Sequence, residues 1–182
     1  MTSEGILHRP GSLRIAGLDP SSSRLGYATP SGELVSLRPS AGSEDPARRL
    51  YEISRLVDDA LRRYPPRPDL VVLEGYALGS PHRHTLLTLG EVGGVVRLRL
   101  FELDVPFVVV TPTNLKRFST GNGNADKARM VARAIELGAR PTVNDDEADA
   151  FHLRRMGRAA HGLEYPLVTV ELDALASSGV NW

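Results

Sequence analysis

The sequence contains no cysteine in its 182 residues, which excludes a disulfide framework, a thiolate zinc site and a cysteine nucleophile. It has no apolar run close to the roughly 20 residues that a membrane span requires. Its first residues have neither the basic stretch nor the apolar core of a secretory signal peptide. We therefore expect a cytoplasmic protein without a membrane partner.

The sequence also has no net charge, because 22 Lys and Arg residues balance 22 Asp and Glu residues. A uniformly basic nucleic-acid binder is therefore excluded, and any contact with nucleic acid must use a face on which the charges are segregated. Lysine is rare and occurs only at Lys116 and Lys127, on either side of a glycine-rich stretch. The rest of the composition, 41% hydrophobic and 24% charged, is that of an ordinary globular domain.

The apolar pattern predicts an α/β fold in one domain. Short alternating or continuous apolar runs predict five strands, and apolar residues at a spacing of three and four predict four helices. This order predicts a mixed five-stranded sheet with helices on both faces. The strands are expected over 13–19, 26–29, 34–37, 70–73 and 107–110, and the helices over 47–64, 85–103, 125–137 and 145–160.

We divide the chain into three parts on the same evidence. Residues 1–12 form an N-terminal extension, and residues 13–161 form the predicted domain. Residues 162–182 form a peripheral C-terminal tail, with one short strand expected over 167–170.

Four acidic residues occupy places where an α/β fold builds a site. Asp19 and Glu74 end predicted strands, and open α/β sheets place their sites at the carboxyl ends of strands. Asp146 and Asp149 are three residues apart on a predicted helix, so both project from one face. Ligands that offer only oxygen select Mg²⁺ or Mn²⁺. Two such ions about 4 Å apart would suit phosphodiester hydrolysis.

Each carboxylate can also serve a purely structural purpose. Asp19 precedes Pro20 and could begin a turn, and Asp146 could favour the dipole of its helix. Taken alone, Asp146 is better explained in this way. Glu74 follows four apolar residues and would be partly buried, so it requires a partner.

Four segments resemble motifs of RuvC, the family of Holliday junction resolvases. They are residues 15–27 (IAGLDPSSSRLGY), 72–74 (VLE), 121–127 (GNGNADK) and 146–150 (DEADA), and they follow the order of the family. The resemblance implies a ribonuclease H-like fold, a homodimer, and nicking of branched DNA such as four-way junctions. It also implies two Mg²⁺ or Mn²⁺ ions in each active site, held by Asp19, Glu74, Asp146 and Asp149.

Two segments depart from the usual bacterial pattern. Residues 74–77 read EGYA and residues 79–82 read GSPH. With the glycine-rich helix predicted over 85–103, they make the chain look more like bacteriophage-encoded members of the family. That helix is our candidate for the dimer surface, since small residues allow close approach; if it instead lies flat on the sheet, the interface is elsewhere.

The same resemblance places Lys116 and Lys127 close to the scissile phosphate, where Lys127 is expected to take part in catalysis. The candidates for DNA contact are Lys116, Arg117, Gly121, Gly123, Arg129 and Tyr76. Residues 121–124 can equally be a flexible connection in which Asn124 caps the next helix, and Tyr76 can equally pack under a loop. A supporting role for His152, one helical turn after Asp149, is also open.

The sequence thus favours a divalent-metal-dependent endonuclease, a crossover junction endodeoxyribonuclease that resolves Holliday junctions and other branched DNA. Two alternatives remain: a YqgF-like nuclease that processes RNA, and a non-catalytic adaptor that binds branched DNA.

Overall fold

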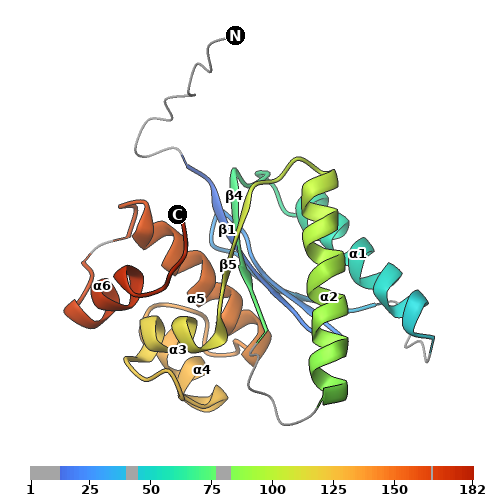
Figure 1. Cartoon of the computed structure of the whole chain (residues 1–182). Helices are drawn as coiled ribbons and strands as arrows, with labels where there is room; N and C mark the ends of the chain where they lie inside the picture. The colour runs from blue at the N-terminus through green and yellow to red at the C-terminus, as the bar shows by residue number, and fades with distance from the viewer. Residues whose placement is uncertain (1–12, 40–44, 77–82, 165) are drawn as a thin grey trace.

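The computed structural model describes residues 13–39, 45–76, 83–164 and 166–182. In it, five strands form one sheet of order β3-β2-β1-β4-β5 (Figure 1). The first three strands form an antiparallel meander, and β4 and β5 run parallel to β1. The strands are β1 Ile15–Pro20, β2 Leu25–Ala28, β3 Leu34–Leu37, β4 Leu70–Glu74 and β5 Phe107–Val110.

Helices cover both faces of this sheet. One face carries α1 Pro46–Arg63 and α2 Arg83–Glu102, which pack against each other. The other carries α5 Asp145–Ala160, which lies against β1, β2 and β4 (Figure 1). Beside α5 lie α3 Pro112–Thr120, α4 Lys127–Glu136 and α6 Thr169–Ala176. The predicted mixed sheet with helices on both faces is therefore confirmed.

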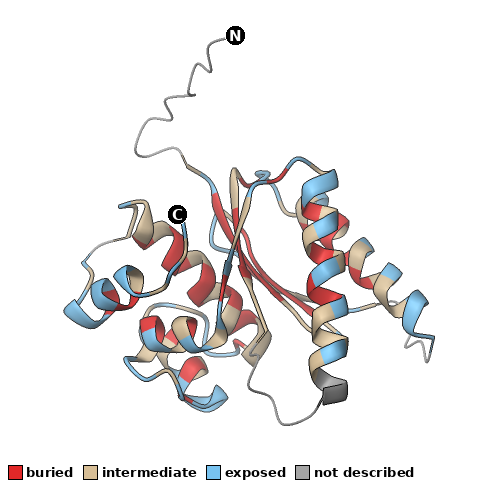
Figure 2. Cartoon of the chain, viewed as in Figure 1, coloured by how far each residue is buried: buried red, intermediate tan, exposed pale blue. Residues whose placement is uncertain are grey.

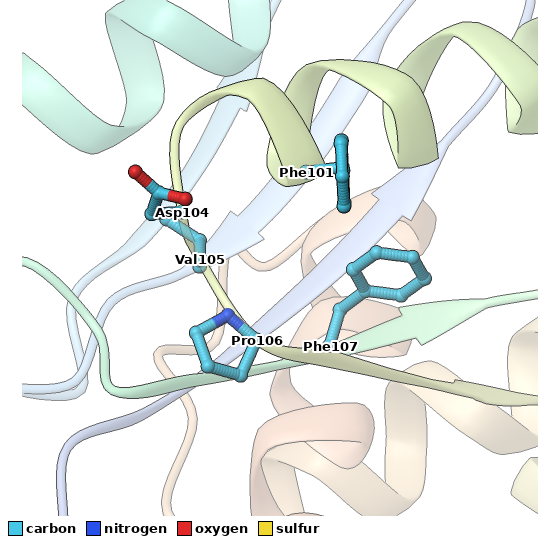
Figure 3. Close-up of a pocket in the computed structure, with 5 residues that line it drawn as sticks. All are labelled: Phe101, Asp104, Val105, Pro106 and Phe107. Atoms are coloured by element: carbon cyan, nitrogen blue, oxygen red, sulfur yellow. The ribbon is translucent and has the colours of Figure 1, made fainter. Parts of the chain in front are cut away.

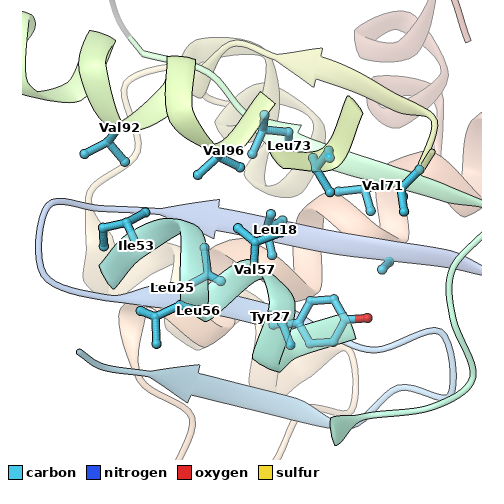
Figure 4. Packing of buried hydrophobic residues seen from close by; sticks show 14 residues of the cluster. Leu18, Leu25, Tyr27, Ile53, Leu56, Val57, Val71, Leu73, Val92 and Val96 are labelled. Carbon is cyan, nitrogen blue, oxygen red and sulfur yellow. The ribbon is translucent and has the colours of Figure 1, made fainter. Parts of the chain in front are cut away.

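Two larger hydrophobic clusters hold these layers together, one on each face of the sheet, and a smaller third cluster joins β2 and β3 to α4 and α5 (Figure 2). The first joins α1 and α2 to the sheet and includes Leu18, Tyr27 and Val57 (Figure 4). The second lies under α5 and includes Val72 and Leu153. Because successive residues of a strand point to opposite faces, β1 and β4 supply side chains to both clusters.

Three glycines let α5 lie directly on the sheet. A Cβ atom at Gly17 would lie 2.0 Å from the carbonyl oxygen of Ala150, and one at Gly26 would lie 2.2 Å from that of Asp146. Gly157 is equally tight against Val72, at 2.5 Å. This close contact brings the first two turns of α5 to the carboxyl ends of β1 and β4.

The structure corrects the sequence analysis in two places. Residues 112–120 form α3, which was not expected; Thr111 caps it and Pro112 begins it, but nine residues are too few for a clear periodic pattern. The strand expected over 167–170 is wrong, because α6 begins at Thr169. Glu171 directs this start: one of its carboxylate oxygens accepts a hydrogen bond from the amide of Val168, while the other pairs with Arg155.

The remaining predictions concern the N-terminal extension, the C-terminal tail and membrane-spanning segments. Residues 1–12 and 77–82 lie outside the described residues, and so do the departures from the bacterial pattern that fall on them. The division at residue 161 stays a prediction; α6, beyond it, packs against α3. Within the described residues, no helix combines the length and apolar character needed to cross a membrane.

Candidate active site

Three carboxylates meet at one edge of the sheet. Asp19 lies near the end of β1, Glu74 ends β4, and Asp149 comes from the second turn of α5. Each offers one oxygen atom, and the three oxygens lie within 4.8 Å of one another. The parallel pairing of Leu18 with Leu73 places the first two carboxylates side by side, and the glycine contacts of α5 bring in the third. We call these residues the acidic triad.

Burial and mutual repulsion make these carboxyl groups hold protons at unusually high pH. Burial is the largest cause for each: it raises the pKa of Asp19 to about 6 and, with the nearby charge of Asp19, that of Asp149 to about 7. The pKa of Glu74 rises well above its usual range for the same two reasons. Three neighbouring anions, one buried and two partly buried, are unstable unless protons or a cation neutralise them.

The donor set of the acidic triad fits a hard divalent cation. All three ligands are carboxylate oxygens, which favour Mg²⁺ or Mn²⁺ over softer metals. A bound cation would also replace the protons that burial otherwise forces onto the triad. The triad is therefore a group of side chains that can hold such an ion.

Asp146, the fourth predicted ligand, lies outside the triad in the described structure. It is close enough to Asp19 for its charge to raise the pKa of that residue. Its Oδ2 atom accepts a hydrogen bond from Nη1 of Arg24 at 3.2 Å. Sequence reasoning missed Arg24, although it belongs to the motif that contains Asp19.

Both lysines of the chain act on the acidic triad, from two different helices. The charge of Lys116 on α3 lowers the pKa of Glu74 and Asp149. The charge of Lys127, the first residue of α4, lowers the pKa of Asp19 and Asp149. Lys127 also forms an ion pair with Asp145, with Nζ 2.5 Å from Oδ2. This pair, which the sequence analysis did not foresee, raises the pKa of Lys127 and lowers that of Asp145.

The glycines of residues 121–124 are required by the local structure. Gly121 ends α3 in the left-handed conformation, with φ of 80°, and its amide donates to the carbonyl of Arg117. At Gly123, a Cβ atom would lie 2.8 Å from the side chain of Thr113. Asp126 caps α4, so the alternative in which Asn124 caps that helix is wrong. The exposed side chains of Arg117 and Arg129 lie on either side of this stretch.

Tyr76 lies beside the acidic triad in a hollow of about 180 Å³ that Glu74 also lines. Its ring lies over Gly93 of α2, and the guanidinium carbon of Arg97 is 6.0 Å from the ring centre. Tyr76 is only partly buried, so one side of the ring can still be reached from this hollow.

His152 points away from the site. Its ring is fully buried, and Nε2 lies 3.0 Å from the carbonyl oxygen of Met130 on α4. Burial lowers its pKa to about 4, so the ring is neutral. His152 therefore has no supporting role in the site, and its buried ring packs α5 against α4.

Comparison with known proteins agrees with this geometry. The family model "Crossover junction endodeoxyribonuclease RuvC" matches residues 15–154. The chain is 34% identical over 153 residues to the protein of that name from Mycolicibacterium vanbaalenii, covering 78% of this chain and 76% of the relative. It is 32% identical over 152 residues to that from Mycobacterium sp. (strain KMS), covering 78% and 80%.

Solved structures extend the likeness to the fold. The structure of Thermus thermophilus RuvC matches with a TM-score of 0.58 and 24% identity, over 84% of this chain and 99% of that chain. The same protein in complex with a Holliday junction substrate matches with a TM-score of 0.58 and 25% identity, over 84% and 98%. The expected ribonuclease H-like fold is thereby confirmed. The likeness to bacteriophage members stays a prediction. By family model, curated relatives and fold, this chain belongs to the RuvC family.

Proposed function

We propose that the protein is a divalent-metal-dependent endonuclease that resolves Holliday junctions and other branched DNA in the cytoplasm. The observation that carries this proposal is the partly buried acidic triad, which lies under the charges of two lysines. The names of its relatives, crossover junction endodeoxyribonucleases, support the same activity, and a structural neighbour was solved with a Holliday junction substrate.

The carboxylates and the lysines of the site have different roles. Asp19, Glu74 and Asp149 hold the metal, and Asp146 joins them as a further ligand. Two Mg²⁺ or Mn²⁺ ions held by these residues would supply Lewis-acid chemistry to the attacking water and the leaving oxygen. Lys116 and Lys127 hold positive charge beside the scissile phosphate and offset the negative charge that develops on it.

The DNA follows the exposed side of α3 and α4. Arg117 and Arg129 neutralise backbone phosphates on this side, and Gly121 and Gly123 lie between them along the chain. Tyr76 stacks on a base that is unpaired at the junction, which supplies about 1–3 kcal/mol per base. Strong dependence on salt follows, because binding rests on phosphate contacts.

A second copy of the chain docks on the outer face of α2. Three large apolar side chains of this helix are exposed to solvent: Leu87 by 69%, Leu98 by 58% and Phe101 by 75%. A monomer rarely exposes neighbouring apolar side chains of this size. Between them, a Cβ atom at Gly90 or Gly94 would meet nothing within 4 Å, so a second helix can approach closely. Beyond Phe101 the surface is hollowed, and Figure 3 shows this hollow, of about 370 Å³, lined by both Phe101 and Phe107.

Such a dimer carries two active sites, as paired nicks on opposing strands require. The double variant Leu98→Glu/Phe101→Glu should sediment as a monomer and lose paired cleavage, whereas the native protein should sediment as a dimer at micromolar concentration. A native protein that stays monomeric would contradict the dimer.

The decisive experiment compares substrates with and without the metal site. With Mg²⁺, the protein should cut four-way DNA in preference to flap, bubble and linear duplex DNA. Asp149→Asn should abolish nicking yet leave junction binding in Ca²⁺ unchanged, and Asp173→Asn, at an exposed position on α6, should change neither. Preferential cutting of structured RNA would support the YqgF-like alternative, and binding without cutting would support the adaptor.

A further inference from the structure

Asp146, which lies next to the acidic triad, is held in an ion pair. Arg24 donates a hydrogen bond to Asp146 with Nη1 3.2 Å from Oδ2, and the Asp146 side chain is only 13% exposed. Among the described carboxylates, those that converge within 4.8 Å are Asp19, Glu74 and Asp149. The site therefore has three ligands that already converge and a fourth that is bound to a cation of the chain itself.

The position of Arg24 is set by the backbone around it. It closes the turn between β1 and β2, where the Ser21 amide donates to its carbonyl at 2.9 Å and its amide donates to Ser21 Oγ at 3.0 Å. Two residues later, Gly26 lies directly against the backbone of Asp146. The turn and the start of α5 are thus in contact, and the guanidinium is held over the carboxylate.

The ion pair between Arg24 and Asp146 affects how the site can bind metal ions. A first ion can bind the triad without disturbing Arg24. A second ion that uses Asp146 must compete with the guanidinium for the same carboxylate, whose Oδ2 atom Arg24 already occupies, and the two cations repel each other. The pair is partly exposed, with the Arg24 side chain 34% accessible, so the competition is moderate.

We propose that Arg24 is a positioning residue that holds Asp146 away from the acidic triad and thereby makes the second divalent ion bind more weakly than the first. The proposal rests on the proposed metal-dependent function and deepens it. Metal occupancy is then sequential, and full occupancy requires Asp146 to exchange Arg24 for the second ion.

Titration of the metal-free protein with Mn²⁺, in the absence of DNA, tests this directly. Calorimetry and the electron paramagnetic resonance signal of free Mn²⁺ should show one tight and one weak site in the native protein. Arg24→Gln should tighten the weak site about threefold to fivefold, the scale of a partly exposed ion pair, and leave the tight site unchanged. Arg24→Lys, which keeps the charge, should keep the weak site within about twofold of the native value.

Two controls complete the design. Arg63→Gln removes a more exposed ion pair with Asp59 on α1, remote from the site, and should alter neither constant. Asp146→Asn should remove the weak site and spare the tight one. An intact tight site in each variant shows that the triad, and so the fold, is preserved.

The proposal is overturned if Arg24→Gln leaves the weak site unchanged or weakens it, or if the native protein binds a single ion. Binding of a single ion would also count against the proposed two-ion arrangement, whereas the nuclease activity itself is judged separately by cleavage of four-way DNA by the native protein. Failure of that cleavage, with two Mn²⁺ sites still present, would count against the function and not against Arg24.

Discussion

Asp19 and Glu74, near the ends of neighbouring parallel strands, share a hydrogen bond that stabilises the charged form of Asp19 and the protonated form of Glu74. Asp19 therefore loses its proton more readily than Glu74, and Glu74 stays protonated until a cation binds. The relationship is a direct product of the sheet, because adjacent parallel strands end at the same edge.

The raised pKa values predict how stability depends on pH. The folded protein without metal binds more protons than the unfolded chain, in which the pKa of an Asp side chain is about 3.9. The resulting stabilisation is complete below that value and is lost as pH rises through the folded pKa values of about 6 for Asp19 and about 7 for Asp149. Between about pH 5 and about pH 8, the metal-free protein should lose on the order of 2–4 kcal/mol.

Thermal unfolding followed by circular dichroism checks this prediction. The Tm should fall over that pH range without metal, should fall less in Asp149→Asn, and should recover when excess Mg²⁺ is added, since the ion binds the folded state. A Tm that rises toward pH 8 without metal would contradict the protonated triad.

The salt dependence of DNA binding should report the contacts of α3 and α4. Each phosphate that a side chain neutralises contributes roughly 0.9 to the slope of log affinity against log salt concentration on duplex DNA. The double variant Arg117→Ala/Arg129→Ala should therefore lower the slope by about 1.8. Arg63→Ala, remote from this side, should leave it unchanged. Equal slopes in all three proteins would place the DNA on another face.

The ion pair between Arg155 and Glu171 should anchor the C-terminal helix. Their side chains are 6% and 2% exposed, Nη1 lies 2.6 Å from Oε1, and the guanidinium also faces the ring of Phe118 on α3 at 5.3 Å. In Glu171→Leu, the buried guanidinium of Arg155 loses its main partner. The free energy of unfolding, measured in urea, should fall by about 3 kcal/mol.

The same pair can be separated from its neighbours by a double-mutant cycle. The variant Arg155→Met/Glu171→Leu should cost clearly less than the sum of its single variants, because no charge is then left buried. Additive costs would show that the two residues stabilise the protein independently.

Close contact between α5 and the sheet predicts that Gly17 tolerates no side chain. In Gly17→Ala, the new methyl group would lie 2.0 Å from the carbonyl oxygen of Ala150, so α5 must shift. We expect a loss of at least about 3 kcal/mol and weaker Mn²⁺ binding, because Asp149 moves with the helix. Unchanged Mn²⁺ binding in Gly17→Ala would contradict this role.

Local patterns were sufficient for most of the fold. Four apolar residues before Glu74 and the strand that leads to Asp19 predict their positions at strand ends, because buried strands are recognised by short apolar runs. The capping box of Asn144 and Glu147 likewise starts α5 where its apolar spacing begins. Short helices were missed: α6 is defined by the buried partner that Arg155 provides for Glu171, which no local pattern contains.

By itself, the sequence determined the order of the strands and longer helices, the family of the chain and the four acidic positions, because these depend on local spacing and on motifs. Only the tertiary structure decided which carboxylates converge and which cation faces each of them. Asp146 pairs with Arg24, and Lys127 pairs with Asp145, although 122 and 18 residues separate the partners along the chain. Such pairings arise from packing in three dimensions, where a glycine at a contact decides how closely a helix and its charges approach a strand end.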